Sequence, residues 1–136
     1  EIGTIQPIKE IGNLCEKNNI IFHVDAAQSL GKIKIDVKNM KIDMLSISSH
    51  KIYGPKGIGA LYIKNKKIQT KLEPIIVGGG QENNLRSGTL PTALIVGFGK
   101  ACELALNKME ADAIRIKQFS KQQYLSRYNF ESNVNF

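Results

Sequence analysis

The chain has 136 residues, of which 42% are hydrophobic and 23% charged, and this balance favours one globular unit with a modest core. The sequence has no apolar run long enough to span a bilayer, and its first residues do not resemble a signal peptide, so we expect no membrane partner. The formal net charge is +7, but the lysines are scattered without interleaved aromatic residues, so we expect no nucleic-acid partner.

The first residues and the cysteines add two further expectations. The stretch Glu1-Ile2-Gly3-Thr4 does not start with Met and is typical of mid-chain sequence, so we expect a fragment of a larger protein. Cys15 and Cys102 lie far apart, each in a helical pattern, which fits packed thiols in a reducing compartment better than a disulfide.

The first elements alternate between a helix and short extended segments. Apolar residues at helical spacing predict a helix over residues 7–17, with Pro7 in its first turn. The compact β-branched run of residues 20–24 predicts a buried strand. Residues 31–37 alternate apolar and charged side chains and predict a short exposed strand or an extended connection.

Two further strands and a long helix follow. Residues 43–48 and 58–63 are rich in strand formers and predict strands. The lysines at positions 64, 66, 67 and 71 predict a solvated loop, and residues 73–88 predict a polar loop. From Pro91 a helix is expected to reach about Tyr124, and the tail of residues 129–136 is expected to be loose. One face of that helix carries Leu94, Phe98, Ala101, Ala105 and Met109.

Two predicted strands end in groups that can do chemistry. Asp25 follows the strand of residues 20–24, and Lys51 follows the strand of residues 43–48. The element order suggests an α/β architecture with a parallel pair, in which both side chains emerge at one edge of the sheet. Pyridoxal phosphate needs a lysine for its Schiff base and a carboxylate at its ring nitrogen. An acid and a lysine at one edge therefore suggest this cofactor.

A phosphate group would need hydrogen-bond donors close to the lysine. Ser48 and His50 are adjacent to it in sequence, and Thr89 with the backbone N–H of Gly88 offers a second set. We predict no metal ligand among these residues.

Each of these signals also has a simpler explanation. Asp25 could cap the turn that follows it, and taken alone capping is the better interpretation. Lys51 could be solvated, and His50 and His23 could be structural histidines. From composition and spacing alone, the chain is an α/β domain with a possible anion or cofactor site.

Taken together, the motifs resemble the cysteine desulfurases, which belong to the fold-type I pyridoxal phosphate enzymes and are similar to class V aminotransferases. The resemblance covers roughly the first 110 residues. It is carried by Glu1-Ile2-Gly3, His23-Val24-Asp25-Ala26-Ala27-Gln28, Ser48-Ser49-His50-Lys51, Tyr53-Gly54-Pro55-Lys56-Gly57, Gly78-Gly79-Gly80-Gln81-Glu82 and Arg86-Ser87-Gly88-Thr89. It implies a mostly parallel sheet with flanking helices, as part of a large cofactor-binding domain over residues 1–117. Residues 118–136 would form the start of a connecting helix and a loose or divergent tail.

The resemblance also implies a role for each site residue. Lys51 would hold the cofactor as a Schiff base and shuttle the substrate Cα proton. Asp25 would pair with the ring nitrogen, and Gln28 would hydrogen-bond the phenolic oxygen. Ser48 and His50 would bind the phosphate. Thr89 would bind the phosphate of the cofactor in the partner subunit of a homodimer.

The implied reaction converts L-cysteine to L-alanine and an enzyme persulfide, for iron–sulfur clusters or tRNA thiolation, with a scaffold or acceptor protein as partner. The family's persulfide cysteine lies downstream of the Arg-Ser-Gly-Thr motif, and Cys15 and Cys102 do not match it. We therefore expect the chain alone to be inactive. Asn83-Asn84 also departs from the usual Arg-Gly, and Ser49 from a frequent glycine.

Other functions remain open on the sequence. One is that of a related lyase, such as a selenocysteine lyase or a kynureninase-like protein. Another is that of a non-catalytic remnant that only folds or binds a partner. The compartment is expected to be bacterial cytoplasm, with the mitochondrial matrix as the alternative.

Overall fold

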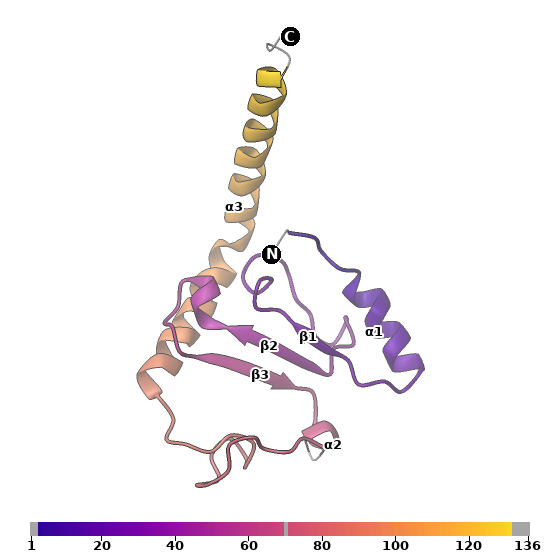
Figure 1. Ribbon diagram of the computed structural model, residues 1–136, viewed down its shortest axis with the longest axis vertical. Coiled ribbons are helices and arrows are strands. Elements are labelled where there is room, and N and C mark those ends of the chain that lie inside the picture. Colours follow the sequence, from indigo (N-terminus) through magenta and orange to yellow (C-terminus); the bar gives the residue numbers. More distant parts are fainter. Residues whose placement is uncertain (1–2, 70, 132–136) are drawn as a thin grey trace.

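The computed structural model describes residues 3–69 and 71–131, without the side chains of residues 69 and 124–131. In Figure 1 a small sheet lies between the short helix α1 and the long helix α3, and α3 extends well beyond the body. The elements in chain order are α1 (Ile8–Lys17), β1 (His23–Asp25), β2 (Met44–Ser48), the 3-10 helix η1 (Ser49–Ile52), β3 (Gly59–Ile63), α2 (Lys66–Gln69) and α3 (Thr92–Glu131).

The sheet has three strands in the order β1-β2-β3. β1 pairs with β2 in parallel, which confirms the predicted α/β architecture with a parallel pair, and β3 returns antiparallel to β2. The predicted buried strand over residues 20–24 is wrong in two respects. β1 is shorter, and its two ends, His23 and Asp25, are exposed. The reason is that β1 is an edge strand here, with only Val24 turned toward the core.

The helix α1 agrees with the prediction. It begins after Pro7 and ends before Asn18, whose backbone N–H donates to the Leu14 carbonyl oxygen. Gly12 is buried against Met40, and a Cβ at this position would collide with the Met40 carbonyl oxygen. The missing side chain therefore lets α1 lie directly on the segment that leads into β2.

Residues 31–37 form turns and an extended connection, which is one of the two predicted alternatives. Two other predictions need correction. The lysine-rich segment is a short helix, α2, where a loop was expected; the Asn65 side-chain oxygen accepts a hydrogen bond from Ile68 N–H at 3.1 Å and caps it. The last helix, α3, runs past Tyr124 to Glu131, so the start of the expected loose tail is helical. Residues 132–136 of that tail lie outside the described part of the chain, and α3 crosses residue 117 unbroken.

The core consists of two clusters that both contact Ile47 of β2. Ala26, Ile42 and Leu45 form one cluster, against which Ile8 of α1 and Val24 pack. The second cluster joins Ile52 of η1 to Phe98 and Ala101 of α3. Ile47 of β2 packs against both clusters, which makes this strand the central support of the molecule. The buried stripe predicted for α3 is confirmed at Phe98 and Ala101.

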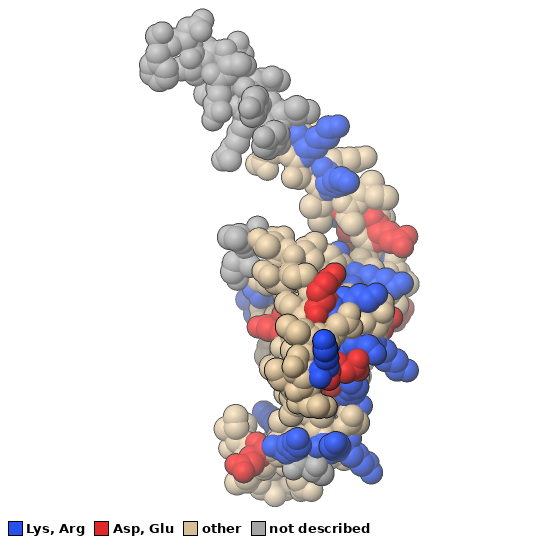
Figure 2. Space-filling view, turned by 90° about the vertical axis from the view of Figure 1, so that its right-hand side faces the viewer, with Lys and Arg blue, Asp and Glu red and all other residues tan. Residues whose placement is uncertain are grey.

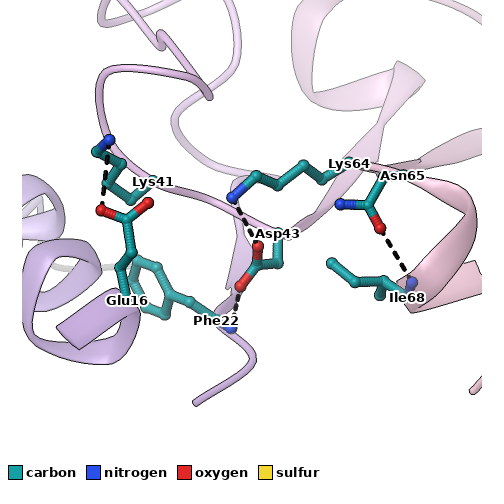
Figure 3. A network of polar contacts seen from close by, with 7 residues as sticks. All are labelled: Glu16, Phe22, Lys41, Asp43, Lys64, Asn65 and Ile68. Carbon is teal, nitrogen blue, oxygen red and sulfur yellow. Dashed lines mark hydrogen bonds and ion pairs between the residues drawn. The ribbon is translucent and has the colours of Figure 1, made fainter. Parts of the chain in front are cut away.

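A carboxylate holds together the sheet edge where β2 begins (Figure 3). Asp43 accepts a hydrogen bond from the Phe22 backbone N–H at 3.0 Å and pairs with the Lys64 ammonium at 3.1 Å. Phe22 leads into β1 and Lys64 follows β3. One side chain therefore connects both outer strands to the central one. Lys41 and Glu16 form a neighbouring, more exposed pair at 3.3 Å.

The surface charges are mixed. On the face shown in Figure 2, basic and acidic side chains are interspersed from the lower body up along α3. This distribution agrees with the scattered lysines of the sequence. Within residues 3–69 and 71–131, no helix is both long and apolar enough to cross a membrane. Cys15 in α1 and Cys102 in α3 are both free and half-buried, as predicted.

Candidate cofactor site at the sheet edge

The parallel pairing brings the candidate acid and lysine to one edge of the sheet. Asp25 lies opposite Ser46, and the Ala26 backbone N–H donates to the Ser46 carbonyl oxygen at 2.9 Å. From Ser46 the chain completes β2 and passes directly into η1, which carries Lys51. The C-terminal ends of β1 and β2 therefore share the edge at which open α/β sheets bind ligands.

The carboxylate of Asp25 also has a local role. Its Oδ1 accepts a hydrogen bond from the Ala27 backbone N–H at 2.9 Å, which is the capping interaction that the sequence suggested. Asp25 is exposed, and an ionised carboxylate has several acceptor positions. Capping and recognition of a ring N–H are therefore compatible in one side chain.

Gln28 lies on the turn that follows β1. The turn is closed by the Ser29 and Leu30 backbone N–H groups, which both donate to the Ala26 carbonyl oxygen. The Gln28 side-chain oxygen accepts a hydrogen bond from the Lys32 ammonium at 3.3 Å, and the residue is exposed. Gln28 is therefore at the same edge as Asp25, one turn further along the chain.

Ser48 and His50 form a polar pair at the end of β2. Ser48 Oγ and His50 Nδ1 lie 3.0 Å apart, and His50 is exposed. A hydroxyl and an imidazole in contact provide two adjustable donors for an anion such as a phosphate. His23 has a different role, because its Nε2 lies 2.7 Å from Ser46 Oγ across the parallel pair. This contact is the structural use predicted for His23.

The half-buried Lys51 lies in η1 between the buried residues Ser49 and Ile52, with the exposed His50 directly before it. Ser49 is 0% exposed and Ile52 is 5% exposed. η1 is followed by Tyr53, which has a left-handed backbone with φ 65° and a fully exposed side chain. A left-handed tyrosine is unusual and reverses the chain sharply toward β3. The backbone around Lys51 is therefore held by packing on both sides.

Thr89 is placed differently from the other candidates. It is exposed and belongs to the connection between α2 and α3, which runs apart from η1 in Figure 1. The hydrogen bonds found in the described part of the chain include none between Thr89 and Ser48, His50 or Lys51. Asp25, Gln28, Ser48, His50 and Lys51 thus lie at or just beyond the ends of β1 and β2, whereas Thr89 belongs to a separate loop that precedes α3.

The two glycine-containing motifs of that connection do come together. Gly88 N–H donates to the Gln81 side-chain oxygen at 2.9 Å, and Gly80 N–H donates to Ser87 Oγ at 3.3 Å. Ser87 is 5% exposed, so this hydroxyl is the buried centre of the loop. The segment just before Thr89 is therefore tied back to Gly80 and Gln81.

The backbone of this loop also explains the pair Asn83-Asn84, which stands where the resembled family usually has Arg-Gly. Glu82, Asn83 and Asn84 all have a left-handed backbone, with φ of 52°, 57° and 65°. Asparagine tolerates this conformation better than other residues with a Cβ, apart from Asp and His. Position 84 is usually glycine in the resembled family, and glycine adopts a left-handed backbone easily because it has no Cβ. Asn84 adopts the same backbone in this chain.

The candidate site is exposed at Asp25, Gln28 and His50. Two apolar hollows of about 210 and 240 Å³ lie elsewhere in the described part of the chain. The first lies between α1 and the sheet, and the second between residues 30–35 and α3. Neither is lined by Asp25, Ser48, His50 or Lys51.

The packing of η1 against α3 was not predicted from the sequence. Gly97, Ala101 and Ala105 lie one turn apart on the α3 face that meets η1 and its flanking loops. The signal was present in the sequence, because small residues at helical spacing allow another backbone to approach closely. Ala101 and Ala105 were predicted only as members of an apolar stripe, to which Gly97 was not assigned.

Comparison with known proteins supports the fold and identifies the family of the chain. The family model for aminotransferase class-V matches residues 1–129. Mitochondrial cysteine desulfurase of Saccharomyces cerevisiae is 59% identical over 120 residues, covering 88% of this chain and 24% of that protein. Cysteine desulfurase IscS of Ehrlichia chaffeensis is 58% identical over 118 residues, covering 87% and 29%.

A solved structure has a similar fold. SspA in complex with cysteine superimposes with a TM-score of 0.72 at 59% identity, over 76% of this chain and 29% of that chain. The present chain thus spans between about a quarter and a third of the length of the proteins it matches. By its family match and these relatives, the chain belongs to the aminotransferase class-V family of fold-type I enzymes, and the two relatives named above are cysteine desulfurases.

Proposed function

We propose that this chain is the cofactor-holding part of a pyridoxal phosphate-dependent cysteine desulfurase. The observation that carries the proposal is the parallel register of β1 and β2, in which Asp25 lies opposite Ser46 and Lys51 follows on the same edge. Relatives at 58–59% identity are named cysteine desulfurases, which supports the substrate L-cysteine and the product L-alanine.

The donor set at the edge fits the cofactor. Lys51 offers a primary amine, Asp25 an exposed carboxylate, and Ser48 and His50 a hydroxyl and an imidazole in contact. Pyridoxal phosphate, when bound, supplies an electron sink that stabilises negative charge at the substrate Cα. A lysine, a carboxylate and a phosphate site together are the set of groups that this cofactor requires.

Each residue then has a defined task. Lys51 attaches the cofactor and moves the proton at the substrate Cα. Asp25 keeps the ring nitrogen protonated by accepting its N–H, while the same carboxylate caps the following turn. Gln28 donates to the phenolic oxygen. Ser48 and His50 donate to the phosphate.

The remaining tasks, completing the phosphate site and accepting the sulfur, are performed by a second copy of the chain and by a cysteine other than Cys15 and Cys102. Thr89 reaches the phosphate site of a second copy in a homodimer, which is compatible with its exposure in one chain. Neither Cys15 nor Cys102 accepts the sulfur, because both are part of packed helices, and burial raises the pKa of the Cys102 thiol. The sulfur passes to a scaffold or acceptor protein.

The cellular site of the reaction is bacterial cytoplasm or the mitochondrial matrix. One relative is named as the mitochondrial protein of yeast and another is the IscS of a bacterium, which supports the pair of alternatives.

Borohydride reduction tests the proposal directly. The full natural polypeptide containing these residues is mixed with pyridoxal phosphate and reduced, and the modified peptide is identified by mass spectrometry. The pyridoxyl group is expected on Lys51 and lost in Lys51→Ala. Lys56→Ala is the matched control, because Lys56 is an exposed lysine in the adjoining loop. Label spread over surface lysines, or unchanged in Lys51→Ala, would favour a non-catalytic chain.

A further inference from the structure

We propose that three residues of α3, Gly97, Ala101 and Ala105, form a rigid seat that positions Lys51 and the turn after Asp25 relative to each other. We call these three residues the α3 seat. The inference rests on the proposed function, because it names the positioning residues behind the lysine that holds the cofactor. The three residues act through η1 and its neighbouring loops and not on the cofactor itself.

The first contact lies just beyond the lysine. A Cβ placed on Gly97 would lie 3.0 Å from Pro55 Cγ and 3.3 Å from Pro55 Cδ. These distances are shorter than ordinary van der Waals contact, so the proline ring lies against the bare backbone of α3. The loop between η1 and β3 therefore rests on the helix without an intervening side chain.

The second contact lies directly beneath η1. A Cβ on Gly54 would lie 3.0 Å from Ala101 Cβ and would collide with Ser49 Oγ. Ser49 is 0% exposed, and within the described part of the chain its hydroxyl has no hydrogen-bond partner. Ser49 and Gly54 are also joined through their backbones, because Gly54 N–H donates to the Ser49 carbonyl oxygen at 3.1 Å. This side of η1 has no free space.

The third contact involves the other half of the site. Gly31 has a left-handed backbone with φ 68°, and a Cβ there would lie 2.8 Å from Ala105 Cβ and 3.0 Å from Ile52 Cγ2. Gly31 belongs to the turns that follow Asp25 and Gln28, whereas Ile52 is the residue after Lys51. Both segments that carry cofactor-holding groups therefore meet on one helix.

The physical consequence is precise placement of the lysine. Close-packed interiors do not deform continuously, so a shift of a few tenths of an ångström at the α3 seat must move η1 or the turn. Misplacement of reacting groups by small distances reduces the rate of chemistry far more than it changes binding. The α3 seat is thus a positioning device for Lys51, at one remove from the cofactor.

A matched pair of variants tests the inference in the full natural polypeptide. Gly97→Ala pushes a methyl group against Pro55, whereas Gly99→Ala, on the same helix, meets nothing within 4 Å. Alanine is a better helix former than glycine, so both variants are expected to keep α3 intact. The readouts are the visible circular dichroism of the bound cofactor, which reports its tilt in the protein, the fraction trapped on Lys51 by borohydride, and kcat with L-cysteine.

We expect Gly97→Ala to reduce the visible circular dichroism and to lower kcat by on the order of tenfold with little change in KM. Gly99→Ala is expected to match the unmodified protein. Pro55→Ala removes both ring atoms that the new methyl group meets, so the double variant Gly97→Ala/Pro55→Ala should regain the signal. This rescue separates positioning from a general loss of stability.

The inference is overturned if Gly97→Ala and Gly99→Ala give the same circular dichroism and kcat, or if Pro55→Ala fails to rescue the first. In either case the proposed function stands as long as the unmodified protein is trapped on Lys51. Failure of the unmodified protein to be trapped on Lys51 overturns the proposed function, and this inference with it.

Discussion

Asp43 and Lys64 form an ion pair, with Oδ1 and Nζ 3.1 Å apart, at the end of the sheet opposite the one that carries Lys51. The side chain of Asp43 is only 16% exposed, and its second oxygen accepts the Phe22 backbone N–H. The sheet is therefore held at this end by one carboxylate, while the other end is left open for polar chemistry.

Removal of that carboxylate is expected to destabilise the fold. Asp43→Ala leaves the Phe22 N–H without its acceptor and Lys64 without its partner, so the free energy of unfolding should fall by about 1–3 kcal/mol. Asp43→Asn retains an acceptor oxygen and should lose less. Urea denaturation followed by far-ultraviolet circular dichroism measures both.

The control for this experiment is an exposed pair. Asp112 and Arg115 form an ion pair at 2.9 Å on α3 with both side chains largely exposed. Asp112→Ala should change the free energy of unfolding by only about 0–1 kcal/mol. Equal losses in Asp43→Ala and Asp112→Ala would contradict the role given to Asp43.

Charge at Asp25 can be separated from its capping role. Asn caps turns about as well as Asp, so Asp25→Asn should keep the bond to the Ala27 N–H and the stability of the turn. It removes the negative charge that keeps the cofactor ring nitrogen protonated. We therefore expect the rate with L-cysteine to fall steeply while the melting temperature stays the same.

Asp36→Asn is the matched control. Asp36 is exposed and its Oδ1 also accepts a backbone N–H two residues on, from Lys38 at 3.1 Å, but it does not follow a strand at the edge of the site. Its replacement should leave the rate unchanged. A rate that survives in Asp25→Asn would refute the ring-nitrogen role.

The phosphate role of Ser48 predicts a loss of affinity. Ser48→Ala removes a donor to a charged group, and such a bond contributes about 1.5–3 kcal/mol, so pyridoxal phosphate should bind about tenfold to a hundredfold more weakly. Ser46→Ala removes a hydroxyl from the same strand that contacts His23 and should have little effect on affinity. Equilibrium titration followed by visible absorbance distinguishes the two variants.

The left-handed loop predicts the outcome of replacing Asn84. Asn84→Gly should be tolerated, because glycine adopts φ 65° without strain. Asn84→Val should cost about 1–2 kcal/mol locally and open the loop of residues 80–88. The rate of cleavage of this loop by a protease under native conditions is the measurement. Equal rates for the two variants would show that the left-handed backbone is not required.

The thiol of Cys102 predicts a pH dependence. Burial raises the pKa of the Cys102 thiol, so the folded chain favours its neutral form. In the unfolded chain the thiol ionises at lower pH. The contribution of this group to stability is thus fully present below the unfolded pKa and is lost as the pH rises through the folded pKa.

Alkylation measures this shift. In a Cys15→Ser variant, the rate of reaction of Cys102 with iodoacetamide should rise at higher pH in the folded chain than in the chain unfolded by urea. Coincident pH profiles would contradict the burial argument. The same experiment tests whether Cys102 is a poor nucleophile near neutral pH.

Local signals in the sequence predicted several elements well. The helix α1 and the strands β2 and β3 were predicted from the spacing of apolar residues and from the residues that mark the ends of each element. These signals lie within a few residues of each other in the chain. The lysine-rich α2 was missed because its helix is only four residues long and is capped by Asn65. The burial of β1 was overestimated because exposure of a strand depends on its neighbours in the sheet and cannot be read from its own residues.

The amino-acid sequence by itself determined which chemical groups are available. Asp25, Lys51 and the Ser48–His50 pair were identifiable because each lies at the end of a strand-forming run or within a few residues after it, and chemistry at a strand end is a local property. Only the tertiary structure decided that β1 and β2 are parallel neighbours, that Gly80 and Gln81 hydrogen-bond Ser87 and Gly88, and that Gly97 and Ala101 support η1. These relationships join residues that are not neighbours in the chain, and they are set by hydrogen-bond register and close packing, which no single segment encodes.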